Sequence, residues 1–222
     1  MKILIRLTFL ASLGVALFSC DQNEDLGEFE SFESCDYLRA KVGTTWTFTG
    51  ENGFSTNTTV IGDTLIDGRQ VLVTENENSI GYMGCFEKGI IGTAPEVIGV
   101  QGTVVGEVTI ELVLDEQVGY TWAGPVLQYE SNGFDITTTY TYEIIEKGKE
   151  MEVNGTTYQD VVVVKATYEG VIEGFDDPFA TGRLDYYFAP EVATIRSLFY
   201  SPNPFTGELE IGSTIDLANY EY

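Results

Sequence analysis

Carboxylates are the only plentiful reactive side chains in this sequence. The chain has 35 Asp and Glu residues, 11 Lys and Arg residues and no histidine. Without histidine, Ser-His-Asp catalysis, Cys-His catalysis and imidazole-ligated metals are excluded. Two carboxylates roughly 5–10 Å apart could hydrolyse a glycosidic bond, but in so acidic a chain many pairs of acids meet by chance. We therefore expect no enzyme activity, with a carboxylate-based glycosidase as the alternative.

The densest acidic loop of the body is a candidate calcium site. Glu173, Asp176 and Asp177 lie within five residues of one another, and Ca²⁺ takes oxygen ligands. The spacing does not match an EF-hand loop. The alternative is a solvated acidic loop that ends at Pro178.

Aromatic side chains could form a surface on which sugar rings stack. The alternative, which we favour, is ordinary packing in the core and across strands. Three aromatics are adjacent at residues 186–188, so at least one points away from the core if this segment is a strand. The candidate ligand-binding aromatics are Trp122, Tyr140, Tyr142, Tyr186 and Tyr187.

The first twenty residues have the pattern of an export signal. Lys2 and Arg6 precede an uncharged apolar stretch at 7–18, which is shorter than the roughly 20 residues that a membrane-spanning helix needs. The stretch ends in Leu17-Phe18-Ser19-Cys20, which resembles a bacterial lipobox. That resemblance implies cleavage before Cys20 and attachment of diacylglycerol and a fatty acyl chain to it. The alternative is an ordinary signal peptide followed by a cysteine.

An acidic cluster follows Cys20 directly. Residues 21–25 read Asp-Gln-Asn-Glu-Asp, which resembles the export signal of Bacteroidota lipoproteins and implies the outward face of the outer membrane. The alternatives are a plain tether and the periplasmic face. The mature chain keeps all 35 acids against nine bases, a side-chain charge of −26. So acidic a protein has no affinity for nucleic acid, because phosphate binding depends on Lys and Arg.

The two remaining cysteines are Cys35 and Cys85. Export places them in an oxidising compartment, and two thiols allow one intramolecular pairing. We predict a Cys35–Cys85 disulfide, with two unpaired buried thiols as the alternative.

From residue 42 onward the pattern is that of β structure. Apolar and polar residues alternate over 134–144 and 104–114, which is typical of antiparallel strands with one wet face. Val161–Val164 are consecutive, which predicts a strand covered on both faces. Asp67-Gly68 and Asn154-Gly155 indicate type I′ hairpins. We predict an all-β fold, an antiparallel roll, half-barrel or sandwich of ten or more short strands, with little or no helix outside the signal peptide.

The body is expected to consist of two similar halves. The segment Val-Gly-Thr-Thr-Trp at 42–46 recurs as Val-Gly-Tyr-Thr-Trp at 118–122, and a hairpin and an apolar strand follow each. We place the repeats at about 42–95 and 118–197. The predicted organisation is a signal peptide at 1–19, a lipidated acidic tether at 20–34 and one β domain at 35–222.

The body also resembles a broad group of uncharacterised β-rich lipoproteins of the same bacteria. The group commonly has glycine where this chain has Glu191 and Ala193, so we expect the turn there to differ. No activity follows from the resemblance. The matching residues are Gly43 and Trp46; Gly62, Asp63 and Thr64 with Asp67 and Gly68; Val153, Gly155 and Tyr158; the run 186–192; and Leu217 with Tyr220.

Three functions are compatible with these features. The first is a lipid-anchored, non-catalytic β domain that binds or scaffolds a partner at the outer membrane. The second is a carrier or chaperone of an apolar ligand inside a curved sheet. The third is a calcium-assisted protein that binds or hydrolyses a glycan.

Thr64 is a candidate modification site. In Asp63-Thr64-Leu65, it matches a short bacterial O-glycosylation pattern.

Overall fold

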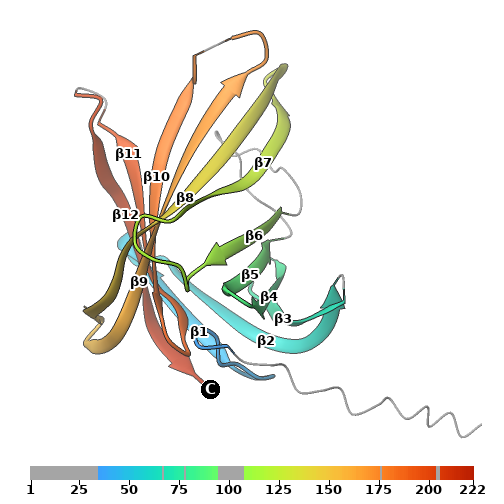
Figure 1. Cartoon of the computed structure of the whole chain (residues 1–222), viewed down its shortest axis with the longest axis vertical. Coiled ribbons are helices and arrows are strands. Elements are labelled where there is room, and N and C mark those ends of the chain that lie inside the picture. The colour runs from blue at the N-terminus through green and yellow to red at the C-terminus, as the bar shows by residue number, and fades with distance from the viewer. Residues whose placement is uncertain (1–34, 67, 78, 95–107, 176, 204–205) are drawn as a thin grey trace, which may run out of the picture. The chain divides into compact units, whose positions relative to one another are not determined.

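The computed structural model describes residues 35–222 except 67, 78, 95–107, 176 and 204–205. These residues form one antiparallel sheet that curves into a nearly closed barrel (Figure 1), so the predicted all-β class is confirmed. The single helical turn in the described part is η1 (Glu51–Gly53). The strands are β1 (Thr45–Gly50), β2 (Ser55–Ile66), β3 (Arg69–Glu75), β4 (Ile80–Phe86), β5 (Gly89–Ala94), β6 (Val108–Val113), β7 (Thr121–Ser131), β8 (Phe134–Val153), β9 (Thr156–Ile172), β10 (Ala180–Ala189), β11 (Ala193–Pro202) and β12 (Leu209–Glu221).

The sheet is built from two six-stranded meanders, β1–β6 and β7–β12. The strand order is β6-β5-β4-β3-β2-β1-β12-β11-β10-β9-β8-β7. The meanders join where β1 pairs antiparallel with β12, from Thr45 opposite Glu221 to Gly50 opposite Ile215. The two meanders correspond to the two expected halves, while the internal repeat with its bounds of about 42–95 and 118–197 stays a prediction.

The two repeated Val-Gly-x-Thr-Trp segments begin the two meanders in the same way. Gly43 and Gly119 both have positive φ, at 92° and 87°, a conformation that glycine adopts without steric cost. The amide of Gly43 donates to the carbonyl of Val60, and the amide of Gly119 donates to the carbonyl of Ile144, both at 2.8 Å. Each glycine therefore fixes the entry of a first strand against its second strand.

Three hairpins show the expected turn chemistry. Asn154 and Gly155 have φ of 49° and 81°, as the central residues of a type I′ turn require. Gly68 also has positive φ, while Asp67 lies outside the described residues. The sequence contains the same signal at Asn132-Gly133, with φ of 53° and 79° between β7 and β8, and this hairpin was not predicted.

Because the strands alternate in direction, the connections gather at two opposite ends of the barrel. The open end carries the connections at 51–54, 76–79, 132–133, 173–179 and 203–208. The closed end carries those at 67–68, 87–88, 114–120, 154–155 and 190–192, together with residues 35–44 and the C-terminus. Figure 1 shows the C-terminus at the bottom, which is the closed end.

The segment 35–40 seals the closed end. Leu38 is fully buried there and forms a bridge with Val192, between β10 and β11. The indole Nε1 of Trp46 donates to the carbonyl of Val192 at 2.9 Å. The predicted disulfide is present and ties Cys35 to Cys85 on β4, with 5.8 Å between the two Cα atoms. We call residues 35–40 the plug.

The core lies beside the plug, in the half of the barrel near the closed end. All four residues Val161–Val164 have 1% or less of their surface exposed, so this strand is covered on both faces as predicted. Around them pack Val60 and Leu72 of the first meander and Ile144, Phe188, Ile195 and Leu217 of the second. Burial of aliphatic side chains from both meanders holds the two halves together.

The two ends of the sheet, β6 and β7, meet without ladder pairing in the described part of the chain. Side chains bridge them instead. The indole Nε1 of Trp122 donates to the carbonyl of Glu111 at 3.0 Å, and Lys147 Nζ donates to the carbonyl of Leu114 at 2.8 Å. The barrel is therefore closed by a full strand ladder at one joint and by side chains at the other.

The turn between β10 and β11 keeps a glycine-like backbone without glycine. Glu191 and Ala193 have φ of 64° and 68°, a region that residues with a Cβ rarely adopt; the expected difference from the resembling lipoproteins stays a prediction. Hydrogen bonds fix the backbone: the amide of Glu191 donates to the carbonyl of Asp36 at 2.7 Å, and the amide of Arg39 donates to the carbonyl of Glu191 at 2.9 Å. The plug thus supports a conformation that costs free energy for residues with a Cβ.

Removal of the disulfide should loosen the plug. For a Cys35→Ser/Cys85→Ser double variant we expect the free energy of unfolding to fall by about 2–4 kcal/mol, because the unfolded chain gains freedom. Urea unfolding of the mature body measures this change. The reduced wild-type protein is the matched control and should lose a similar amount. An unchanged unfolding midpoint in both would contradict a stabilising bridge.

Candidate functional site

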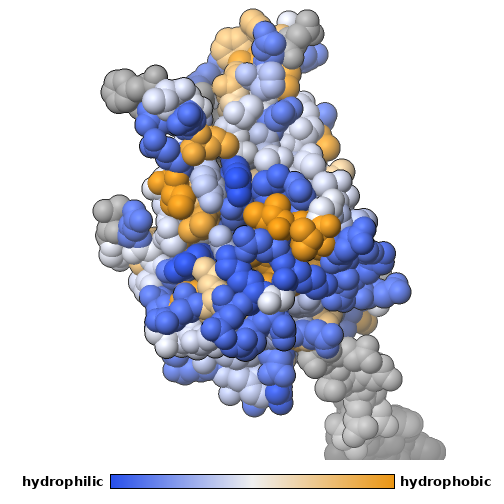
Figure 2. All heavy atoms as spheres, turned by 60° about the vertical axis from the view of Figure 1, so that its left-hand side comes forward, coloured by the Kyte–Doolittle hydropathy of each residue, from blue (hydrophilic) through white to orange (hydrophobic). Residues whose placement is uncertain are grey.

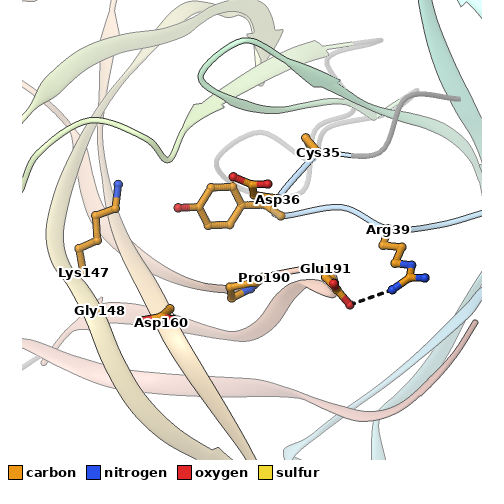
Figure 3. Close-up of a pocket in the computed structure, with 9 residues that line it drawn as sticks. Cys35, Asp36, Arg39, Lys147, Gly148, Asp160, Pro190 and Glu191 are labelled. Atoms are coloured by element: carbon orange, nitrogen blue, oxygen red, sulfur yellow. Dashed lines mark hydrogen bonds and ion pairs between the residues drawn. The ribbon is translucent and has the colours of Figure 1, made fainter.

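The first candidate site is a polar cleft beside the plug, with a volume of about 700 Å³. Figure 3 shows that its residues come from the plug, from β8 and β9 and from the turn after β10. The cleft is lined by Cys35, Asp36, Tyr37, Arg39, Lys147, Gly148, Asp160, Pro190 and Glu191.

Four polar side chains of this cleft, those of Tyr37, Arg39, Lys147 and Glu191, contact the protein itself. Arg39 forms an ion pair with Glu191 at 3.4 Å, the dashed contact in Figure 3. Lys147 and the hydroxyl of Tyr37 both donate to the carbonyl of Leu114, at 2.8 and 3.3 Å. These contacts fasten the plug to the barrel wall, so we interpret the cleft as structural.

A second candidate site lies inside the barrel. This first hollow has a volume of about 340 Å³. It extends from Trp46 and Ala193, next to the plug, to Phe54 at the open end, and the Phe54 side chain is 49% exposed. The remaining lining residues are Phe48, Thr56, Thr58, Met83, Tyr186, Thr194, Ser197 and Ile215.

A second hollow of about 310 Å³ adjoins the first. The two share Met83, Tyr186 and Thr194, which therefore mark their junction. The second hollow reaches the open end at Asn76 and Ser79, in the connection between β3 and β4. Its other lining residues are Thr74, Gly81, Tyr82, Gly92, Thr93, Ile110, Leu112 and Phe188.

Among the residues that the structure describes, no charged side chain lines either hollow. The lining combines aromatic rings, aliphatic groups and a methionine with a few hydroxyls and one amide. Such a surface suits the burial of an apolar body with occasional hydrogen bonds. Its polar groups, among the described residues, include the hydroxyls of Ser, Thr and Tyr and the amide of Asn76.

Glycines help to keep the inner wall open above the core. A Cβ at Gly182 would collide with the ring of Tyr168 on the neighbouring strand, and one at Gly170 would lie 3.0 Å from the ring of Phe179. Each ring therefore lies against the backbone of the next strand. Rings that lie flat on the sheet leave the space in front of them free.

The fold has a solved counterpart. No protein-family model and no curated protein matches the chain. A crystal structure of a protein from Parabacteroides distasonis, assigned as a lipoprotein, has the same fold. Its TM-score is 0.52 and its identity 14%, over 85% of this chain and all of that one. A protein from Bacteroides fragilis, assigned as exported with a YmcC-like fold, matches with a TM-score of 0.40 and 10% identity over the same shares.

The predicted aromatics lie in three places. Trp122 and Tyr142 stack on the inner wall with ring centroids 5.3 Å apart, and Tyr140 lies 5.7 Å from Tyr168 on the same wall. Tyr186 is the one member of the set that lines both hollows. Tyr187 lies on the outer face, where Lys149 approaches its ring to 5.7 Å.

The calcium and modification candidates stay predictions. Glu173 and Asp177 are exposed at the open end, and Asp176 lies outside the described residues. No group of three or more potential metal-ligating side chains occurs among the residues that the structure describes. Thr64 is exposed on β2, and Cys20 lies outside the described residues.

In the described part, no helix is long and apolar enough to cross a membrane.

The outer face contrasts with the hollows. Figure 2, seen from the side of β11 and β12, shows mostly hydrophilic residues, with hydrophobic ones in small separate groups. One carboxylate on this face, Asp185, is only 2% exposed. Arg183 donates to both of its oxygens, at 2.8 and 2.7 Å, and Tyr200 donates at 3.1 Å. This buried charge is thus fully paired.

Sequence reasoning missed most of the hollow. Phe48, Phe54, Met83, Thr194 and Ile215 carry no motif, and they meet only because β1, β4, β11 and β12 curve toward one another. The one available signal was the alternation of Trp46 and Phe48 with threonines, which predicts a shared face.

Two tyrosines with raised pKa values, the buried Tyr37 and the half-buried Tyr186, should make stability depend on alkaline pH. Burial raises the pKa of Tyr186 to about 12, and burial together with nearby Asp115 raises the pKa of Tyr37 to about 12. The unfolded chain releases these protons near pH 10, whereas the folded protein retains them. The free energy of unfolding should therefore be highest below pH 10 and fall as the pH rises from about 10 to about 12.

Urea unfolding across this pH range, with phenolate absorbance recorded in parallel, measures the effect. Tyr37→Phe and Tyr186→Phe should each flatten the dependence, because each removes one of the raised pKa values. Tyr222→Phe, at an exposed position, is the control. An identical slope in the wild type, Tyr37→Phe and Tyr186→Phe would contradict the assignment.

Proposed function

We propose that this protein is a lipid-anchored, non-catalytic β domain at the outward face of the outer membrane, and that it carries an apolar ligand inside its curved sheet. The observation that carries the proposal is the pair of adjoining hollows, whose described lining residues carry no charge. The 35 acids and 11 bases of the chain contribute no side chain to this described lining, which leaves it suited to an apolar ligand.

The free energy for such binding comes from apolar burial. Burial of apolar surface contributes about 25 cal/mol per Å², and a preformed hollow adds no cost for rearranging the protein. Trp46, Phe48 and Ile215 supply the apolar wall. The hydroxyls of Thr56 and Ser197 provide the few polar contacts that orient a ligand.

The anchoring part of the proposal rests on the N-terminal sequence. The lipobox-like run that ends at Cys20 and the acidic residues after it support lipidation and an outward location. The match in fold to a protein assigned as a lipoprotein agrees with an envelope role. Several acyl chains on one cysteine give stable anchoring, at about 0.8 kcal/mol per buried CH₂ group.

Filling the junction of the hollows should abolish ligand binding. The probe is N-phenyl-1-naphthylamine, whose fluorescence rises in an apolar environment. We expect Thr194→Phe, at the junction, and Thr56→Phe, in the first hollow, to weaken binding at least tenfold, or about 1.4 kcal/mol. Thr47→Phe is the matched control, because Thr47 follows Trp46 on β1 and lies on the other face of the strand.

The second filling variant keeps the test valid if the first fails to fold. Circular dichroism and the urea midpoint confirm that each variant is native. Absence of probe binding to the wild type, or equal binding to all three variants, would overturn the carrier function.

Cys20→Ala should release the protein from membranes. The substitution removes the thiol that receives the diacylglycerol, so labelling with a radioactive fatty acid should disappear and the protein should move to the soluble fraction. Ser19→Ala keeps a small residue before the cysteine and should leave labelling unchanged. Membrane attachment that persists in Cys20→Ala would contradict lipidation at this residue. Protease added to intact cells reports the outward location.

A further inference from the structure

The two ends of the barrel differ in their charged side chains: bases accompany the acids at the closed end, whereas the described connections of the open end contain acids alone. At the open end, the described connections contain exposed acids and no Lys or Arg. The acids are Glu51, Glu77, Glu173, Asp177 and Glu208. The mouth of the barrel is therefore uniformly acidic across the connections that the structure describes.

The bases of the mature chain gather elsewhere. Six of its nine bases lie at the closed end, and the other three form ion pairs on the outer face of the sheet with Glu143, Asp185 and Asp216. The closed-end bases are Arg39, Lys41, Arg69, Lys88, Lys147 and Lys149. No base is thus placed to neutralise the acids at the mouth.

Acids adjoin the openings of both hollows in the chain. Glu51 is three residues from Phe54, which lines the first hollow at the open end. Glu77 lies between Asn76 and Ser79, which line the second. Both carboxylates are therefore close in the chain to residues that line a hollow at the open end.

The same end carries a third depression, a cleft of about 540 Å³ across β7, β8 and β9. Its lining includes Glu130, Asp135 and Glu173 and no base. A group of acids alone does not make a site. Here the acids lie at the end of the barrel to which the uncharged hollows extend. The acids and the hollows would bind different parts of one ligand.

We infer that the ligand is a cationic amphiphile. Its apolar chain occupies the hollows, and its ammonium or guanidinium group stays at the acidic mouth. This inference rests on the proposed carrier function and names the ligand class. A hollow of about 340 Å³ accommodates on the order of ten methylene-sized groups at about 30 Å³ each, which corresponds to a medium-length chain.

Two features of the barrel disfavour the binding of an anionic amphiphile of the same length. Its head group meets only carboxylates at the mouth, and its charge finds no cationic partner inside the hollows. These mouth charges are exposed, so their influence extends over a Debye length of about 8–10 Å at moderate ionic strength and about 3 Å at 1 M salt. The preference for a cation should therefore depend strongly on salt.

Three probes with the same ten-carbon chain separate charge from apolar burial: decyltrimethylammonium, decyl glucoside and decyl sulfate. Each is titrated below its micelle concentration into the mature body with Trp122→Phe, so that Trp46 in the first hollow is the fluorescent reporter. Calorimetry gives affinity and stoichiometry. At low salt we expect one decyltrimethylammonium to bind at least tenfold more tightly than decyl sulfate, with the glucoside between. At about 1 M salt the three should converge.

Two triple variants, which remove the same charge at opposite ends of the barrel, show which acids cause the preference for the cation. Glu51→Gln/Glu77→Gln/Glu173→Gln at the mouth should remove most of the preference for the cation and leave glucoside binding unchanged. Glu87→Gln/Glu152→Gln/Asp160→Asn removes as much charge at the closed end and should leave the preference intact. Thr194→Phe should weaken all three probes.

The outcomes distinguish the two claims. Equal or tighter binding of decyl sulfate, or loss of the preference in the closed-end variant, overturns the cationic ligand and leaves the carrier function standing if the glucoside still binds. Failure of all three probes to bind overturns the carrier function and this inference together.

Discussion

The antiparallel joint between β1 and β12 is the constraint on which the rest of the structure depends. Because Thr45 lies opposite Glu221 and Gly50 opposite Ile215, two meanders become one sheet whose connections lie at two common ends. The right-handed twist of such a sheet curls it toward closure, and its outer strands meet through the side chains of Trp122 and Lys147. The interior of the barrel, its open end and its closed end all follow from this one strand pairing.

The main cluster of buried apolar side chains lies in the half of the barrel that the plug seals. There Leu38 and Val161–Val164 are essentially inaccessible to water, and hydrophobic burial stabilises both meanders at once. Toward the open end, the aromatic ring of Tyr168 lies against the backbone of Gly182. The hollows begin at core residues such as Trp46 and Phe188 and extend from there to the open end.

The local features of the fold were predictable because short-range physics sets them. Alternation over β8, the continuous valines of β9, the Asn154-Gly155 turn and the pairing of the two cysteines each depend on neighbouring residues or on a single possible partner. The hollow was not predictable, because Met83, Thr194 and Ile215 meet through the curvature of the whole sheet. The positive φ of Glu191 and Ala193 was not predictable either, since hydrogen bonds to the distant plug hold this turn.

The positions of the acids relative to the hollows restrict which ligands the barrel can bind. A side-chain charge of −26 on the mature protein favours solubility and repels anionic surfaces wherever the charge lies. The acids, however, stand alone at the open end, whereas bases such as Lys88 and Lys149 are paired with acids at the closed end. The field at the mouth is therefore attractive to cations, while the hollows behind it favour uncharged groups. Only a molecule with both properties satisfies the two environments together, and so the charge pattern restricts the ligand more than the apolar wall does.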